Sequence, residues 1–114
     1  MASFLYVFRG NRSGMTPTAS PQEMQQLMQK WRNWIEQLTR SGNFKAGEPL
    51  EPTGKVIRGR TKIVTDGPYA EAKDVVGGYL LIDARSLDEA VELSRGCPVF
   101  ENDGSVEVRP IQQM

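Results

Sequence analysis

Two helix-start signals fix where the helices of this chain fall. Each is a capping box, in which a serine hydroxyl accepts a hydrogen bond from a free backbone N–H and a glutamate three residues later reaches back. The first is Ser20–Glu23, with proline at the first helical position, and the second is Ser86–Glu89. Apolar side chains then recur at helical spacing as far as Gly42 and Gly96. Two helices are therefore predicted, each preceded and followed by strand-like runs.

Strand character is found in four runs of aliphatic, β-branched and aromatic residues. They are residues 4–8, Val56–Val64, Tyr79–Ala84 and Ser105–Ile111. The segment Asn43–Thr53, which contains three Gly or Pro residues, is predicted to be irregular. The order is then β-α-β-β-α-β, which predicts an α+β, ferredoxin-like fold with a four-stranded antiparallel sheet and both helices on one face. The whole chain, residues 1–114, is expected to form a single domain.

Alternation along the strands assigns their side chains to the two faces of the sheet. The side chains expected to face the helices are Leu5, Val7, Leu80, Ile82, Val106 and Val108. Those expected to face away are Phe4, Tyr6, Phe8, Tyr79, Leu81, Asp83, Glu107 and Arg109. Such a helix-free face is too apolar to stay in water, so a homodimer is predicted, in which two of these faces enclose a core or a pocket.

The charge balance and the first residues argue against two classes of partner. Fourteen basic and fourteen acidic residues cancel, and no block of Lys and Arg stands out, so nucleic-acid binding is not expected. The apolar run at the N-terminus is broken at Arg9, which fits neither a signal peptide nor a membrane span of about 20 residues. A cytoplasmic protein without membrane contact is predicted.

The sequence has no histidine and one cysteine, Cys97. Without histidine, His-based general catalysis and the usual zinc, copper and non-haem iron sites are not expected. No metal or cofactor is predicted, and any chemistry would rest on carboxylates, Tyr, Lys or Arg. A single cysteine forms no intramolecular disulfide, and Cys97 has no imidazole partner to make it a thiolate, so a buried or incidental thiol is expected and not a nucleophile.

The segment Asp66–Lys73 packs turn-forming residues and three charges into eight positions, more than a link between two strands needs. Asp66 has two interpretations. Its carboxylate can accept N–H groups of the turn that follows it. Alternatively, Asp66 joins Tyr69, Glu71 and Lys73 in the rim of a pocket over the helix-free face, where it acts as a base or an anchor.

Two charges among the apolar side chains of the helix-free face form a second candidate site. Asp83 and Arg109 need partners there, because an unpaired buried ion costs several kcal/mol. One interpretation is an ion pair at the dimer interface, between Asp83 and Arg109 or between Glu107 and Arg109. The other is a pocket in which Arg109 clamps a carboxylate or phosphate, with Tyr6 or Tyr79 as the hydroxyl donor.

Short motifs follow one another through most of the chain. They are Gly47-Glu48-Pro49-Leu50, Asp66-Gly67-Pro68-Tyr69, Ala70-Glu71-Ala72-Lys73, Gly77-Gly78-Tyr79, Ser86-Leu87-Asp88-Glu89-Ala90 and Val106-Glu107-Val108-Arg109-Pro110. In this order they resemble the DGPF-domain proteins of the YCII-related superfamily over roughly residues 4–111, with Tyr69 in place of the Phe that names the motif.

This resemblance implies a dimeric α+β barrel in a small bacterial protein without a settled activity. Relatives are often encoded beside extracytoplasmic-function sigma factors, which implies a regulatory or stress context. Some members of the superfamily have a His-Asp pair proposed as catalytic. That chemistry does not carry over, because this chain has no histidine.

Two hypotheses about function follow. In the first, the protein is a homodimer that binds a small anionic or aromatic ligand in its barrel and serves a regulatory system. In the second, it is a cofactor-independent enzyme, an isomerase, lyase or oxygenase. Asp66 or Asp83 would then be the base, a tyrosine the acid and Arg109 the stabiliser of an oxyanion, an argument that rests on fold analogy.

Overall fold

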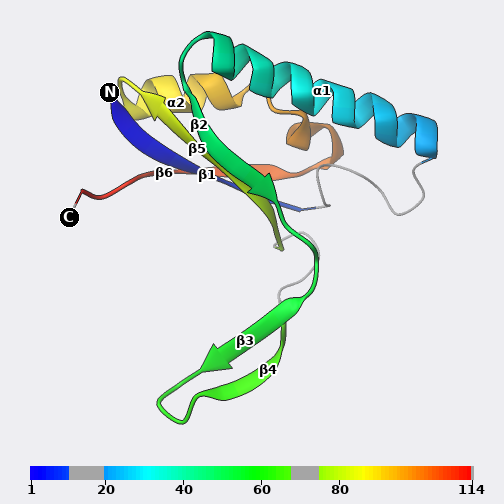
Figure 1. Ribbon diagram of the computed structural model, residues 1–114, viewed down its shortest axis with the longest axis vertical. Coiled ribbons are helices and arrows are strands. Elements are labelled where there is room, and N and C mark those ends of the chain that lie inside the picture. Colours follow the sequence, from blue (N-terminus) through cyan, green and yellow to red (C-terminus); the bar gives the residue numbers. More distant parts are fainter. Residues whose placement is uncertain (11–19, 68–74, 114) are drawn as a thin grey trace.

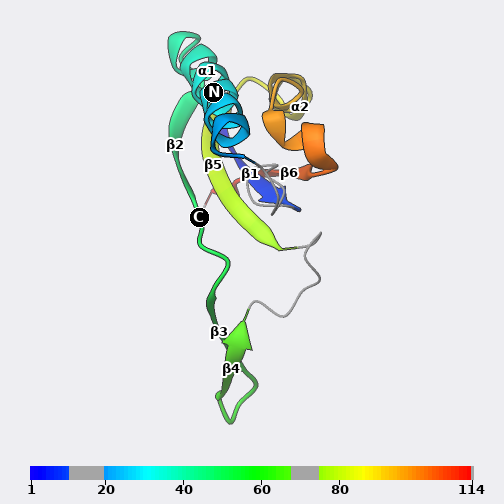
Figure 2. The same cartoon turned by 90° about the vertical axis from the view of Figure 1, so that its right-hand side faces the viewer.

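The computed structural model describes residues 1–10, 20–67 and 75–113, and a four-stranded antiparallel sheet organises it. The strands of this sheet are β1 (Ala2–Arg9), β2 (Phe44–Pro49), β5 (Val76–Ala84) and β6 (Ser105–Pro110), in the order β2-β5-β1-β6. Helices α1 (Pro21–Arg40) and α2 (Leu87–Ser94) both lie on one side of the sheet (Figures 1 and 2). A short 3-10 helix, η3 (Pro98–Asn102), connects α2 to β6. The predicted α+β, ferredoxin-like fold is confirmed.

Both helices begin at the predicted capping residues. Ser20 Oγ accepts a hydrogen bond from the backbone N–H of Glu23 at 3.1 Å, and Ser86 Oγ accepts one from the N–H of Glu89 at 3.1 Å. Each contact satisfies one of the N–H groups that a helix leaves free in its first turn. At the other end of α1, Gly42 adopts a left-handed backbone with φ of 78°, as its predicted role in ending the helix requires.

The core lies between the sheet and the helices and is rich in aromatic rings. Tyr6 stacks on Trp34 of α1, with ring centroids 6.1 Å apart, and Phe8 meets Trp31 edge to face at 5.1 Å. The indole N–H of Trp34 donates to the backbone carbonyl of Leu93 at 3.1 Å, which joins the two helices. Trp34 and Leu38 of α1 are buried in this core, whereas Met24 and Met28 near the start of the helix are exposed.

The prediction of which β1 side chains face the helices was wrong. Phe4, Tyr6 and Phe8 are buried against the helices, whereas Leu5 and Val7 lie on the other face. The register explains the inversion, because Phe4 pairs with Ile82 and Tyr6 with Leu80, and residues directly opposite each other share a face. Since β1 is apolar on both faces, its own pattern could not choose between them. The predicted faces of β5 and β6 agree with the structure.

The prediction for the second strand of the sheet was also wrong. That strand is β2, within the segment expected to be irregular, and it pairs with β5 at the edge of the sheet. An edge strand tolerates Pro49, because its outer backbone needs no partner. Gly47 is required by close approach, since a Cβ there would lie 2.6 Å from the carbonyl oxygen of Tyr79. The glycine and the proline that made this segment look irregular are therefore features of a tightly paired edge.

The residues predicted as that strand form a separate hairpin, which we call the arm (residues 54–67). Its strands β3 (Gly54–Arg58) and β4 (Ile63–Gly67) pair with each other and form a two-stranded sheet of their own. Figures 1 and 2 show the arm extending away from the four-stranded sheet. The Cα radius of gyration of 15.5 Å therefore exceeds the value of about 13 Å typical of a compact chain of this length.

Candidate functional site

The helix-free face of the sheet has an apolar centre, which we call the floor (Leu5, Val7, Tyr79 and Leu81). The register pairs Leu5 with Leu81 and Val7 with Tyr79, so these side chains form two adjacent rows opposite the helices. All four are half-buried in the single chain. The floor offers one aromatic ring and three aliphatic side chains to a ligand or to a second protein surface.

Charged side chains flank the floor on the β6 side. The register places Glu107 opposite Val7 and Arg109 opposite Leu5. Glu107 Oε1 accepts a hydrogen bond from Arg9 Nη2 at 3.2 Å, and Glu107 Oε2 lies 3.8 Å from Arg109 Nε. The side chain of Arg109 is 70% exposed. Its guanidinium is therefore available to a carboxylate or phenolate oxygen of a ligand lying on the floor.

A second group of polar side chains, from β1, β2 and β5, lies beyond the end of the floor that Leu5 and Leu81 form. Asp83 Oδ1 accepts a hydrogen bond from Ser3 Oγ at 2.9 Å. Lys45 Nζ, from β2, lies 3.4 Å from Ser3 Oγ and 3.9 Å from Asp83 Oδ1. The Asp83 side chain is 31% exposed, so the carboxylate is partly shielded yet open to a ligand. A carboxylate bonded to a hydroxyl and next to an ammonium can accept and return a proton.

Three of the predicted site residues share the helix-free face: Tyr79, Asp83 and Arg109. Glu107 and Arg109 contact each other within one chain, and Asp83 has Lys45 as its partner there. An ion pair of these residues across a dimer interface stays a prediction. Their roles in binding or catalysis remain predictions.

Ser3, Arg9 and Lys45 were missed by sequence reasoning. Ser3 and Arg9 have the same parity along β1 as Leu5 and Val7, so the correct face assignment would have found both. Lys45 lies in β2, whose segment was expected to be irregular, and no pattern in the sequence indicated it. Unlike Asp83, Glu107 and Arg109, these three residues could be placed beside the floor only with the strand register.

The prediction that Tyr6 offers its hydroxyl on the helix-free face was wrong. Tyr6 has no exposed surface, and its hydroxyl donates a hydrogen bond to the backbone carbonyl of Ala90 in α2. Burial raises the pKa of Tyr6 above its usual value, because the phenolate would lose its hydration. Tyr6 therefore belongs to the core and not to the floor.

The structure separates Asp66 from the other site residues. Asp66 lies on β4 of the arm, forms an ion pair with Lys55 of β3, and is 89% exposed. It is not brought together with Tyr79, Asp83 or Arg109 in the single chain. The other predicted rim residues, Tyr69, Glu71 and Lys73, lie outside the described residues.

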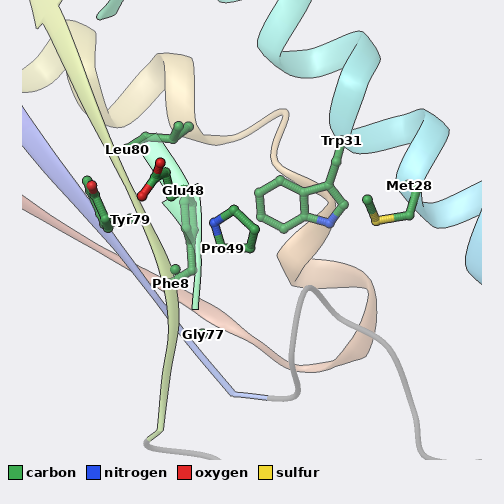
Figure 3. Close-up of a pocket in the computed structure, with 9 residues that line it drawn as sticks. Phe8, Met28, Trp31, Glu48, Pro49, Gly77, Tyr79 and Leu80 are labelled. Atoms are coloured by element: carbon green, nitrogen blue, oxygen red, sulfur yellow. The ribbon is translucent and has the colours of Figure 1, made fainter. Parts of the chain in front are cut away.

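A small apolar pocket lies on the opposite side of the sheet, between α1 and the start of β5 (Figure 3). Its volume is about 120 Å³, and Phe8, Met28, Trp31 and Pro49 contribute to its walls. Cavities of roughly this size hold one benzene-sized ring. Its walls are predominantly hydrocarbon, so the pocket offers little to orient a polar ligand. No pattern in the sequence indicated this pocket.

Cys97 is buried, as predicted. Only 4% of its surface is exposed, and burial raises the pKa of its thiol to about 12. At neutral pH it is therefore a neutral side chain of the core and not a nucleophile.

The described residues contain neither a cluster of metal ligands nor a helix suited to a membrane. In residues 1–10, 20–67 and 75–113, no three Cys, Asp or Glu side chains gather closely enough to hold a metal ion. The helices in the part of the chain that the structure describes are too short or too polar to cross a membrane.

Comparison with known proteins identifies a family, a related sequence and a solved structure of similar fold. The family model of the YCII-related domain matches residues 8–114. An uncharacterized protein of Rhizobium meliloti (strain 1021) is 48% identical over 50 residues, which are 43% of this chain and only 40% of that relative. A solved structure, 5-chloro-2-hydroxyhydroquinone dehydrochlorinase (TftG) from Burkholderia phenoliruptrix AC1100 in complex with 2,5-dihydroxybenzoquinone, superposes with a TM-score of 0.52. The superposition covers 97% of this chain and 95% of the other at 17% sequence identity, so it bears on the fold alone.

Proposed function

Because the chain belongs to the YCII-related domain family, we propose that it acts as a homodimer whose helix-free sheet faces enclose a site for a small, planar, anionic ring. The observation that carries this proposal is the floor, which stays half-buried on one sheet face while both helices cover the opposite face. An apolar centre of this kind, bordered by charges, is typical of a surface that packs against another molecule.

A second copy is the partner that fits the floor. A two-fold axis brings the same apolar patch of two chains together, and burying it contributes roughly 25 cal/mol per Å² of apolar surface removed from water. The charged groups at its border are of both signs, with Glu107 and Arg109 on one side and Asp83 and Lys45 beyond one end. A second copy can therefore meet each carboxylate with a cation, or leave both at a solvated rim.

The residues on and beside the floor suit an anionic ring. Tyr79 provides an aromatic face for stacking, and the exposed guanidinium of Arg109 provides paired donors for a carboxylate or phenolate. The dehydrochlorinase with the similar fold was solved with 2,5-dihydroxybenzoquinone, a small oxygenated ring. That ligand supports the size and polarity of the ring proposed here, although the fold similarity carries no residue-level argument.

Cofactor-independent catalysis is a second candidate, and the contact between Ser3 and Asp83 favours it. A carboxylate with a hydroxyl at 2.9 Å and the Lys45 ammonium at 3.9 Å would serve as an acid–base group beside a bound ring. In that case Asp83 would accept a proton from the ligand, Tyr79 would donate one, and Arg109 would stabilise the developing oxyanion. The cytoplasmic location and the regulatory setting implied by the family resemblance stay predictions.

Sedimentation velocity from 1 to about 100 µM tests the dimer, with Leu81→Asp as the disrupting variant. We expect the wild-type chain to be dimeric and Leu81→Asp to be monomeric with unchanged helix content. The matched control is Leu87→Asp, which places the same carboxylate on an exposed leucine at the start of α2, where it leaves the dimer intact. If Leu81→Asp stays dimeric, the floor is not the interface.

Isothermal titration calorimetry with benzoate and with 2,5-dihydroxybenzoquinone tests the ligand class. We expect binding that weakens about tenfold or more in Arg109→Ala, because a charge-assisted hydrogen bond is removed. The control is Arg40→Ala, which removes an exposed guanidinium from the end of α1. Equal affinities in the two variants would remove Arg109 from the site.

A further inference from the structure

The arm carries apolar side chains that the single chain leaves in water. Ile57 is 65% exposed, Ile63 61% and Val64 57%. The register places Ile57 opposite Val64 on one face and Ile63 opposite Arg58 on the other, so neither face of the arm is wholly polar. A two-stranded hairpin is marginally stable on its own in water. The arm therefore needs a second surface to pack against.

The charges of the arm indicate what kind of surface it can pack against. Lys55, Arg58, Arg60 and Lys62 are basic and Asp66 is the single acid, so the arm has a formal charge of +3 in a chain whose net charge is zero. The basic side chains crowd at its tip, because Arg58, Arg60 and Lys62 surround the turn. Two arms would repel each other, so an acidic surface is required.

The same sequence also provides an acidic surface, which lies outside the arm, on the helices that cover the four-stranded sheet. Residues 86–104 form α2, η3 and the turns beside them, and their sequence contains five carboxylates and one guanidinium. The carboxylates are those of Asp88, Glu89, Glu92, Glu101 and Asp103. Within the chain, Glu89, Glu92 and Glu101 contact Arg85, Arg95 and Lys30. Asp88 and Asp103 are exposed. Because the five carboxylates outnumber the three cations that contact them, the surface of α2 and η3 keeps a net negative charge.

Symmetry selects how two copies bring these surfaces together. The arm continues from β2 at one edge of the sheet, and α2 and η3 pack near β6 at the other edge. If two helix-free faces pack about an axis across the strands, the two β2 edges meet and run in opposite directions, so the arms leave at opposite ends of that edge and lie away from α2 and η3. If the axis runs along the strands, the β2 edge of each copy lies beside the β6 edge of the other. Only the second arrangement pairs basic with acidic surfaces.

We propose that each arm crosses to a second copy of this chain and packs its apolar side chains there, with its basic tip against the acidic surface of α2 and η3. This inference rests on the proposed homodimer and specifies its symmetry and a second contact. A hollow of about 650 Å³ on the arm, lined by Arg58, Thr61, Ile63 and Thr65 among others, provides a receiving surface for side chains of that copy.

Charge reversal tests the contact in the full-length chain. Arg60→Glu with Lys62→Glu reverses the tip of the arm, and we expect the dimer dissociation constant at 50 mM salt to rise about tenfold or more. Adding Asp88→Lys and Glu92→Lys in the same chain reverses the acidic surface as well and restores the constant to within a few-fold of the wild type. The control, Arg32→Glu with Arg40→Glu, changes net charge equally at exposed positions on α1 and leaves the constant unchanged.

The outcomes separate the arm contact from the floor contact. We call Arg60→Glu with Lys62→Glu the tip variant. If it dimerises like the wild type, the arm contact is overturned, even when Leu81→Asp shows that the floor is the interface. Loss of dimer in the tip variant without rescue by the compensating pair also overturns it. If Leu81→Asp stays dimeric while the tip variant dissociates and is rescued, the floor interface fails and the arm contact stands. Binding of a DNA duplex by the wild type that the tip variant loses, with no change in dimerisation, assigns the arm to nucleic acid and overturns the proposal.

Discussion

The hydroxyl of Tyr6 donates a hydrogen bond to the backbone carbonyl of Ala90, which ties the central strand β1 to α2 across the core. The ring of Tyr6 stacks on Trp34, so the same side chain also joins the sheet to α1. Tyr6 thus links three elements through one buried residue. This arrangement accounts for a tyrosine where a phenylalanine would fill the same volume.

Tyr6→Phe removes the hydroxyl and keeps the ring. We expect the free energy of unfolding to fall by about 1 kcal/mol, because one buried hydrogen bond is lost without a cavity. Urea denaturation followed by far-UV circular dichroism measures the change. Ligand binding, followed by calorimetry with benzoate, should be unaffected. A variant of unchanged stability that no longer binds benzoate would return Tyr6 to the site.

Gly47→Ala tests the close pairing of β2 with β5. A Cβ at Gly47 would lie 2.1 Å from Leu80 Cδ2 and 2.6 Å from the carbonyl oxygen of Tyr79, so the strands must move apart. We expect a loss of about 2 kcal/mol or more, within the range typical of overpacked positions. Gly54→Ala is the matched control, because a Cβ at that strand position meets nothing within 4 Å and should leave the denaturation midpoint unchanged. Equal effects of the two substitutions would contradict the observed pairing.

The buried thiol predicts how stability depends on pH. Burial raises the pKa of Cys97 from 9.0 to about 12, so above pH 9 the unfolded chain loses a proton that the folded chain keeps. Folding is then opposed as pH rises, by up to about 1.4 kcal/mol per pH unit between pH 9 and 12. Tyr6 acts in the same direction at higher pH, because burial raises its pKa too.

Denaturation midpoints of the wild type and of Cys97→Ala, compared from pH 7 to 10.5, measure this effect. We expect the wild type to lose its advantage over Cys97→Ala as pH rises, since the variant has no thiol to ionise. Cys97 should also react with a disulfide reagent no faster than the chain unfolds. Parallel curves for the two proteins, or immediate reaction of the thiol at pH 8, would contradict a buried, neutral Cys97.

The helices and the fold class could be predicted because their signals are local. Ser20 and Ser86 cap helices through contacts with residues three positions away, and such contacts need no knowledge of the rest of the chain. The faces of β1 could not be predicted in the same way. Leu5 and Tyr6 are both apolar, and only pairing with Leu81 and Leu80 of β5 decides which of them meets the helices.

The candidate site depended on the same long-range information. Tyr79 and Arg109 lie on the predicted face of the sheet. In β6 the sequence itself indicated the face, because Val106 and Val108 alternate with the charged Glu107 and Arg109. Lys45 was missed because Gly47 and Pro49 read as a loop, although in the structure they suit a tightly paired edge strand. Conversely, the β-branched residues of the arm looked like a sheet strand, since Ile57 and Ile63 have the composition of one without its burial.

Replacing Asp83 or Asp66 by asparagine distinguishes the roles of these two candidate carboxylates. Asp83→Asn keeps an acceptor for Ser3 Oγ but removes a negative charge beside the floor, so we expect benzoate to bind about two- to fivefold more tightly. Asp66→Asn removes a charge from an 89% exposed position on the arm, and we expect the affinity for benzoate to stay unchanged. Calorimetry of both variants beside the wild type measures the difference. If Asp83→Asn binds the ring as expected yet abolishes a measured turnover, the carboxylate is a base and the enzyme hypothesis holds. Weaker binding in Asp83→Asn would mean that the ligand donates a hydrogen bond to Asp83 and is not the anion proposed here.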